Sequence, residues 1–191
     1  MKRLEIWASG GGTNADAIFK YFKNHKDISV VHLGCNRIKA RAFDVAKKHS
    51  VNTTYWNKDK WNATHVLDQL NKRNIDFIIL AGFLKLVPSE VTKAYRGRIL
   101  NIHPSLLPKF GGINMYGNNV HQAVLNSKDD QTGITIHEVN EEFDKGKLIA
   151  QFSAGLVPGV ETIDSIKSKI QRLEHQNFAP IIESFSAKSP T

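Results

Sequence analysis

Residues 3–24 read RLEIWASGGGTNADAIFKYFKN, and this stretch decides the fold. Residues 3–8 form a short apolar run typical of a buried strand, and residues 14–24 have the length and apolar spacing of an amphipathic helix. Three glycines, at positions 10 to 12, separate the two. A strand that passes through a short glycine loop into a helix begins a βαβ unit, and repeated units build a parallel sheet covered by helices on both faces.

The following residues repeat this alternation. Further strands are predicted at residues 28–34, 51–56, 76–82 and 97–103, and helices at residues 40–49, 62–73 and 89–97. Asn62 and Ser89 are predicted to cap the last two of these helices at their N-termini. We therefore expect an α/β fold with a mostly parallel, twisted sheet flanked by helices, Rossmann-like in its N-terminal half.

The pattern changes after Pro108. Residues 109–120 are rich in glycine and asparagine and are predicted to form a mobile loop, a candidate lid over a substrate. Residues 131–139 and 146–152 predict an antiparallel hairpin, and residues 163–185 predict a long final helix. The 191 residues contain no repeat, low-complexity segment or linker, so we expect one domain over residues 1–191.

The composition, 41% hydrophobic and 23% charged residues, is that of a globular protein. One cysteine, Cys35, excludes a disulfide framework and a cysteine-rich zinc site, and HEVNE lacks the second histidine of an H-E-x-x-H motif, so no metal is expected. The absence of an apolar membrane-span pattern and of a signal peptide predicts a cytoplasmic protein without a membrane partner. A monomer and a homodimer both remain open.

The net charge of +8 points to anionic partners. The basic residues form no stripe with interleaved aromatic residues, which disfavours nucleic acid and favours small anionic substrates.

The glycine loop predicts an anion-binding site. Gly10, Gly12 and Ala15 match G-x-G-x-x-[GA], the pattern of dinucleotide-binding loops. A helix N-terminus offers free N–H groups to an anion, and Thr13 and Asn14 add side-chain donors. A purely structural strand–helix turn is the alternative.

Dinucleotide binding itself has weaker support. The second predicted strand ends in Asn36 and Arg37, not in the acidic residue that would hold an adenosine ribose. Arg37 could instead favour a 2′-phosphate, which keeps an NADP-dependent oxidoreductase open.

A second candidate site lies in NIHPSLLP, residues 101–108. Asn101 and His103 are two positions apart on a predicted strand and therefore share one face. Ligands of open α/β sheets bind outside the carboxyl ends of the strands, the edge at which the glycine loop also opens. A donor amide beside an imidazole suits an oxyanion formed at a carbonyl, with the ring relaying a proton. Two polar side chains that merely cap a turn are the alternative.

The segment NEEFDKG, residues 140–146, adds a carboxylate. By itself Asp144, two residues before Gly146, is an ordinary turn residue. It could instead orient His103 and stabilise the protonated ring, as carboxylates do for imidazoles in other sites. Sequence spacing does not bring the two side chains together, so their separation in a structure decides this role.

Over essentially its whole length the chain resembles the phosphoribosylglycinamide formyltransferases, the folate-dependent glycinamide ribonucleotide transformylases. The resemblance rests on the segments ASGGGTN, CNRIKARAFDVAKKH, LAGFLKLVP, RILNIHPSLLPKFGG, GITIHEVNEEFDKGKLIAQ and LEHQNF. It implies the formyltransferase fold and a role in purine (IMP) biosynthesis. The implied reaction transfers the formyl group of 10-formyltetrahydrofolate to the amino group of 5-phosphoribosylglycinamide through a tetrahedral intermediate, without a metal.

The resemblance also implies roles for individual residues. Asn101, His103 and Asp144 match the catalytic trio of the family. The residues that match its substrate-binding positions are Gly12, Thr13, Asn14 and Glu174. The residues that match its folate-binding positions are Lys60, Leu84, Lys85, Leu86, Val87 and, again, Asn101.

The chain departs from the family pattern at several positions. Trp7 stands where a small aliphatic residue is usual, and Phe178-Ala179 stand where Tyr-Pro is frequent. A methionyl-tRNA formyltransferase would need an added tRNA-binding domain, and a formyltetrahydrofolate hydrolase would have a second histidine in place of Pro104. A non-enzymatic folate- or nucleotide-binding module is a further alternative, although binding alone needs no proton relay.

Overall fold

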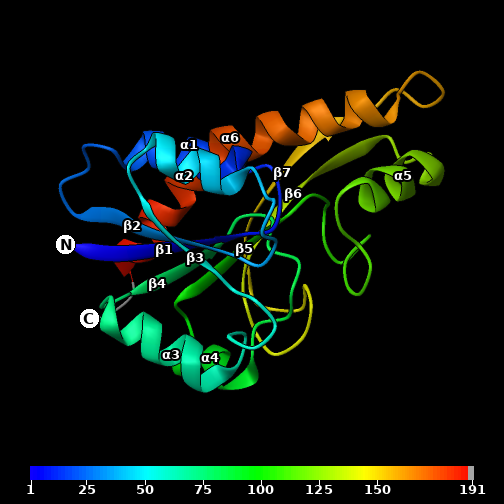
Figure 1. The fold of residues 1–191 in the computed structure, drawn as a ribbon. Helices are drawn as coiled ribbons and strands as arrows, with labels where there is room; N and C mark the ends of the chain where they lie inside the picture. The colour runs from blue at the N-terminus through cyan, green and yellow to red at the C-terminus, as the bar shows by residue number, and fades with distance from the viewer. Residues whose placement is uncertain (189–191) are drawn as a thin grey trace.

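The computed structural model describes residues 1–188, which are built around a seven-stranded sheet (Figure 1). The strands are β1 (Lys2–Ala8), β2 (Ile28–Cys35), β3 (Asn52–Tyr55), β4 (Phe77–Leu80), β5 (Ile99–His103), β6 (Gln131–Glu138) and β7 (Leu148–Gly155). They lie in the order β3-β2-β1-β4-β5-β6-β7. The first five strands pair in parallel, whereas β6 and β7 are antiparallel to their neighbours.

Helices cover both faces of this sheet. They are α1 (Thr13–Phe22), α2 (Ala42–Lys48), α3 (Ala63–Lys72), α4 (Ser89–Ala94), α5 (Asn118–Ser127) and α6 (Ile163–Lys188). Figure 1 shows α1, α2 and α6 on one face and α3 and α4 on the other, while α5 contacts α6 near the β6–β7 side. None of the helices in the described part of the chain is long and apolar enough to span a membrane.

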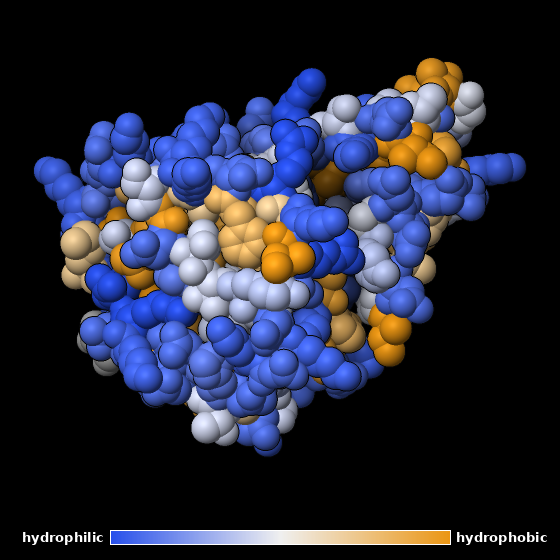
Figure 2. Space-filling view, viewed as in Figure 1, coloured by the Kyte–Doolittle hydropathy of each residue, from blue (hydrophilic) through white to orange (hydrophobic). Residues whose placement is uncertain are grey.

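Two apolar cores separate on the two faces because successive residues of a strand point in opposite directions. Leu4, Ile6 and Ala8 of β1 pack in the core under α1, α2 and α6, and Trp7 packs in the core under α3 and α4. The outer surface in the view of Figure 2 is mostly hydrophilic, with apolar side chains gathered where Figure 1 draws the loop between β7 and α6.

The predicted fold class is confirmed: a mostly parallel sheet, a C-terminal antiparallel hairpin and a long final helix. The predicted domain ends at residue 191, and residues 189–191 lie outside the described part. Asn62 is the predicted cap of α3, since its Oδ1 accepts a hydrogen bond from the backbone N–H of His65 at 2.9 Å. The prediction for Ser89 is wrong, because α4 begins at Ser89 itself and Pro88 holds the capping position without a side-chain hydrogen bond.

The glycine- and asparagine-rich segment after Pro108 is shorter than predicted as a loop, because α5 begins at Asn118. Its asparagines obscure the helical pattern, although Val120, His121 and Val124 are buried on one face at helical spacing.

An acidic side chain lies inside the sheet. Glu5 of β1 is fully buried, and its carboxylate accepts hydrogen bonds from Nε1 of Trp7 at 2.8 Å and from Nη1 of Arg73 at 3.0 Å. Burial raises the pKa of Glu5, while the Arg73 charge and these hydrogen bonds oppose the rise. Trp7 thus has a buried partner for its N–H, which explains how an indole fits at a position where the resemblance implies a small aliphatic residue.

The same indole requires a glycine on the neighbouring strand. Trp7 and Trp56 meet edge to face, with ring centroids 6.2 Å apart, and both pack over Gly34 of β2. A Cβ added at Gly34 would overlap Nε1 of Trp56 and lie 2.8 Å from Cδ1 of Trp7.

We expect Gly34→Ala to lower the free energy of unfolding by about 1–3 kcal/mol, because two buried indoles would have to move. Gly155→Ala in β7 is the matched control, since no atom lies within 4 Å of its added Cβ, and its effect should stay within about 0.5 kcal/mol. Denaturant unfolding of both variants measures the difference. Equal free energies of unfolding would contradict the packing described for Trp7 and Trp56.

Candidate active site

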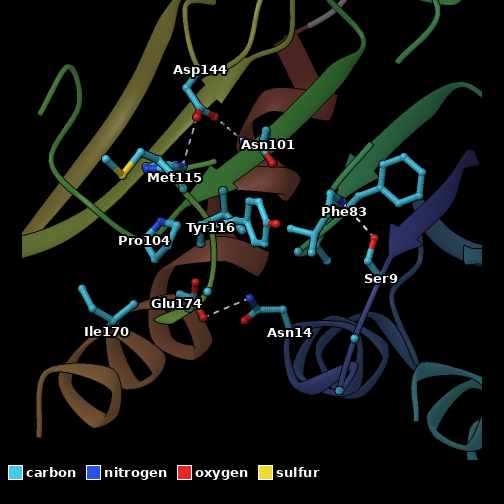
Figure 3. Close-up of a pocket in the computed structure, with 18 of the residues that line it drawn as sticks. Ser9, Asn14, Phe83, Asn101, Pro104, Met115, Tyr116, Asp144, Ile170 and Glu174 are labelled. Carbon is cyan, nitrogen blue, oxygen red and sulfur yellow. Dashed lines mark hydrogen bonds and ion pairs between the residues drawn. The ribbon is translucent and has the colours of Figure 1, made fainter. Parts of the chain in front are cut away.

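A pocket of about 550 Å³ opens at the carboxyl ends of β1, β4 and β5 (Figure 3). Its walls are the glycine loop, the ends of β4 and β5, residues 112–117, the buried His121 of α5, and one face of α6. This is the edge at which ligands of open α/β sheets bind.

The structure brings the three predicted catalytic side chains together. Nδ1 of His103 lies 3.4 Å from Oδ2 of Asp144, and Nδ2 of Asn101 lies 3.4 Å from Oδ1 of the same carboxylate. The side chains of His103 and Asp144 are only 5% and 11% exposed. An amide, an imidazole and a carboxylate therefore share one sheltered corner of the pocket, although 43 residues separate Asn101 from Asp144.

The local backbone directs Asp144 into this corner. Its φ of 55° lies in the left-handed region, which a non-glycine residue adopts at an energetic cost. Two residues later Gly146 approaches the backbone of Glu138 so closely that an added Cβ would overlap the carbonyl oxygen. Within the loop of residues 139–147 that joins β6 to β7, this close approach and the left-handed backbone of Asp144 bring its side chain to Asn101 and His103 of β5.

Asp144 is an ionised carboxylate. Burial acts to raise the pKa of Asp144, but hydrogen bonds from His103, His137 and the backbone N–H of Gly112 hold it well below its ordinary value. The Gly112 N–H donates to Oδ2 at 2.9 Å, so this carboxylate also ties the segment after Pro108 to the site.

His137 of β6 belongs to the site, although no sequence pattern pointed to it. It is the cross-strand partner of Asn101 in the antiparallel pair of β5 and β6. Its Nδ1 lies 2.8 Å from the carbonyl oxygen of Glu138, and Nε2 lies 3.0 Å from Nδ2 of Asn101. With Nδ1 donating to that carbonyl, a neutral ring accepts from the Asn101 amide at Nε2, whereas a protonated ring donates from Nε2 to Oδ1 of Asp144, 3.5 Å away. Only a known strand register would have revealed this pair.

His103 has a second partner on its other side. Nε2 lies 2.8 Å from the carbonyl oxygen of Phe110, a residue with a left-handed φ of 56°. The two ring nitrogens therefore face a main-chain acceptor and the Asp144 carboxylate. A neutral ring donates to only one of them, and a protonated ring donates to both. No cluster of three or more metal-ligating side chains occurs within residues 1–188.

The glycine loop has the geometry of an anion site. Gly12 caps α1 with a left-handed φ of 75°, and an added Cβ would lie 2.8 Å from Cα of Ala42. The first backbone N–H groups of α1 therefore point at the pocket next to Thr13 and Asn14. Nδ2 of Asn14 donates to Oε2 of Glu174 on α6 at 3.0 Å, which fixes one wall against the other (Figure 3).

The predicted folate turn lines a second, smaller pocket of about 50 Å³. Lys85, Leu86 and Val87 contribute to it, whereas Leu84 lines the larger pocket and Lys60 lines neither. Nε1 of Trp61, the residue after Lys60, donates to the carbonyl oxygen of Leu86 at 3.3 Å, which anchors the turn.

The two pockets meet at the catalytic corner. Asn101 and Asp144 line both of them, as do Phe83 and Phe143. A group that passes from a ligand in one pocket to a ligand in the other would cross at these residues.

Glu174 has an unusual ionisation. Desolvation by burial raises its pKa to about 7, against the opposing effects of the Asn14 hydrogen bond and the nearby His103. The carboxyl group therefore changes its charge near neutral pH while it faces the pocket.

We expect this shift to appear in the stability of the protein. In the unfolded chain the carboxyl titrates near 4.5, so between 4.5 and about 7 the folded state keeps a proton that the unfolded state has released. Rising pH in this window therefore lowers the free energy of unfolding. The free energy of unfolding of wild type minus that of Glu174→Gln should fall by on the order of 2 kcal/mol from about pH 4 to about pH 8. Denaturant unfolding at each pH measures it. A difference that does not change with pH would contradict the raised pKa of Glu174.

Comparison with known proteins agrees with this architecture. The profile of the Formyl transferase family matches residues 2–182. A phosphoribosylglycinamide formyltransferase of Bacillus subtilis is 33% identical over 190 residues, which cover 96% of this chain and 94% of the relative. The chloroplastic phosphoribosylglycinamide formyltransferase of Arabidopsis thaliana is 36% identical over 95% of this chain, and the chain spans 64% of that relative. The chain is 34% identical to the chloroplastic phosphoribosylglycinamide formyltransferase of Vigna unguiculata and spans 60% of its length.

Solved structures share the whole fold. The phosphoribosylglycinamide formyltransferase of Bacillus halodurans matches with a TM-score of 0.87 and 32% identity, over 99% of this chain and 97% of that one. The glycinamide ribonucleotide transformylase 1 of Geobacillus kaustophilus matches with a TM-score of 0.87 and 33% identity, over 96% and 98%. Since the family profile covers nearly all of the described residues, this chain belongs to the formyl transferase family.

Proposed function

We propose that this protein transfers the formyl group of 10-formyltetrahydrofolate to the amino group of 5-phosphoribosylglycinamide, with residues 1–191 acting as one formyltransferase domain. The observation that carries the proposal is the junction of two pockets at Asn101 and Asp144. One pocket contains an anion-binding glycine loop and the other lies beneath the turn that matches the folate-binding positions. The names of the relatives and the charge of +8 support two anionic substrates.

The ribonucleotide would lie in the larger pocket. Its phosphate would bind the N-terminus of α1 at Gly12, Thr13 and Asn14, where backbone and side-chain donors converge. Glu174, held by Asn14, would accept hydrogen bonds from the ribose or the glycinamide. The amino group would then reach the corner formed by Asn101 and His103.

The folate would approach from the other side. Its bicyclic ring would bind at the turn that contains Leu84, Lys85, Leu86 and Val87, with the formyl group at the junction. The exposed Lys60 would bind the anionic tail of the folate. It lies near the folate turn, because the indole of the next residue, Trp61, donates a hydrogen bond to that turn.

The chemistry follows from the trio. The amino nitrogen attacks the formyl carbon, a C–N bond forms, and the carbonyl electrons move onto oxygen. The amide N–H of Asn101 and the imidazole of His103 stabilise this oxyanion. The contact of 3.4 Å between Asn101 and Asp144 is long, so a small shift of the amide would direct one hydrogen to the oxyanion.

The tetrahedral species collapses when the bond from carbon to N10 of the folate breaks. That nitrogen leaves with the electron pair and takes up a proton, while the attacking nitrogen loses one. His103 relays the proton, and the ionised Asp144 compensates the charge that the ring gains. A nicotinamide-dependent oxidoreductase has no comparable support, since it would leave this trio without a role.

We expect His103→Ala and Asp144→Asn to lower kcat at least about 100-fold with the fold retained. The first removes a group that contacts the reacting atoms, and the second removes the charge that holds His103. The assay measures formylation of glycinamide ribonucleotide that depends on 10-formyltetrahydrofolate, and circular dichroism checks folding. Glu141→Gln is the matched control, since this exposed carboxylate is on the same loop and should keep full activity. Full activity in either trio variant would overturn the assigned mechanism.

A further inference from the structure

The main-chain ladder between β1 and β4 ends before the folate turn, residues 84–87. Just after the paired part of the two strands, the N–H of Ala81 donates to the carbonyl oxygen of Trp7 at 2.8 Å. One residue further, the N–H of Ser9 donates to the carbonyl oxygen of Gly82 at 3.0 Å. Gly82 has a left-handed φ of 75°, which turns the chain out of the ladder. The folate turn therefore begins where this pairing has ended.

A side chain at the end of β1 holds the start of the turn instead. The N–H of Leu84 donates to Oγ of Ser9 at 2.9 Å, across 75 positions of sequence. Figure 3 draws this hydrogen bond next to the labelled Phe83. Within residues 1–188 the Leu84 N–H has no main-chain acceptor, so the serine oxygen takes the place of a carbonyl.

Both hydrogen-bonding roles of this hydroxyl are in use. Ser9 is only 1% exposed, and its O–H donates to Oδ1 of Asn36, the residue after β2, at 2.6 Å. Because the hydrogen is directed to Asn36, the oxygen is free to accept from Leu84. One buried hydroxyl therefore joins the carboxyl ends of three neighbouring strands, β2, β1 and β4.

The anchored residue lies where the turn passes from one pocket to the other. Leu84 lines the larger pocket, as Ser9 does, and Lys85 lines the smaller one. Phe83, directly before them, lines both. The position of the Leu84 N–H therefore determines how the turn lies relative to the junction of the two pockets.

The anchor at Leu84 is the stronger of two side-chain anchors of the turn. The other is the indole of Trp61, which donates to the carbonyl oxygen of Leu86 over a longer distance of 3.3 Å in an exposed position. A shorter hydrogen bond to a buried hydroxyl competes less with water and restrains the backbone more.

We propose that Ser9 is a positioning residue, whose hydroxyl holds the folate turn so that a bound folate presents its formyl group at the junction of the pockets. The inference rests on the proposed function, and Ser9 acts through Leu84 without contacting the reacting atoms. Loss of the hydroxyl would leave the Leu84 N–H without its acceptor and let the turn shift. A folate on a displaced turn would bind less tightly and hold its formyl carbon away from the attacking nitrogen.

Steady-state kinetics of Ser9→Ala and Ser9→Cys test this role. Cysteine keeps nearly the volume of serine but is a weak acceptor, so both variants should lose the anchor. We expect kcat/KM for 10-formyltetrahydrofolate to fall about tenfold in each, while KM for the ribonucleotide stays within about twofold of wild type. An unchanged kcat/KM for the folate, or an equal loss for both substrates, would overturn the proposal.

Ser186→Ala is the matched control for these kinetics. Ser186 is likewise fully buried, and its hydroxyl donates to the main-chain carbonyl of Ile182 at 2.8 Å, within α6 and outside both pockets. Its constants for both substrates should equal those of wild type.

Two measurements without turnover separate this inference from the proposed reaction. Hydrogen exchange of the Leu84 amide should be at least about tenfold faster in Ser9→Ala than in wild type, and unchanged exchange would contradict the anchor. Calorimetry with tetrahydrofolate should show about fivefold weaker binding to Ser9→Ala. A wild type that binds tetrahydrofolate but formylates nothing would refute the proposed function alone. Equal binding of tetrahydrofolate by wild type and Ser9→Ala would refute the role of Ser9 alone.

Discussion

The carboxylate of Asp144 is the interaction on which the active corner depends. A buried negative charge is unfavourable unless hydrogen bonds and positive charge compensate it. Here the compensating groups come from three separate segments: His103 and Asn101 of β5, His137 of β6, and the backbone N–H of Gly112. Satisfying one charge thus fixes the end of a strand, its antiparallel partner and the segment that borders the substrate pocket.

The change of strand direction after β5 makes this arrangement possible. The parallel strands β1 to β5 bring the glycine loop and the Asn101–His103 pair to one edge of the sheet, as βαβ units do. The antiparallel strands then return along β5, place His137 opposite Asn101, and carry Asp144 back to the same edge. Parallel pairing therefore brings the glycine loop, Asn101 and His103 to the site, and antiparallel pairing brings His137 and Asp144.

The sequence was sufficient for features that depend on local periodicity. Apart from α5, whose asparagines obscure the helical pattern, the order of strands and helices follows from spacings of two and 3.6 residues, as do the helix after the glycine loop and the common face of Asn101 and His103. Contacts across the sheet did not follow in this way. The proximity of Asp144 to His103 was suggested only by family resemblance, and His137 was missed because the register of β5 and β6 is set by packing. The position of Glu174 beside Asn14 depends on how α6 lies against α1, which no local pattern encodes.

The central claim is that the two pockets hold two substrates whose reacting atoms meet at Asn101, His103 and Asp144. A crystal structure with glycinamide ribonucleotide and a folate analogue that cannot transfer its formyl group tests it most directly. We predict the amino nitrogen within about 3.5 Å of the formyl carbon, with Asn101 and His103 in contact with the formyl oxygen. Reacting atoms held apart, or a folate bound away from the turn at Leu84 to Val87, would contradict the account.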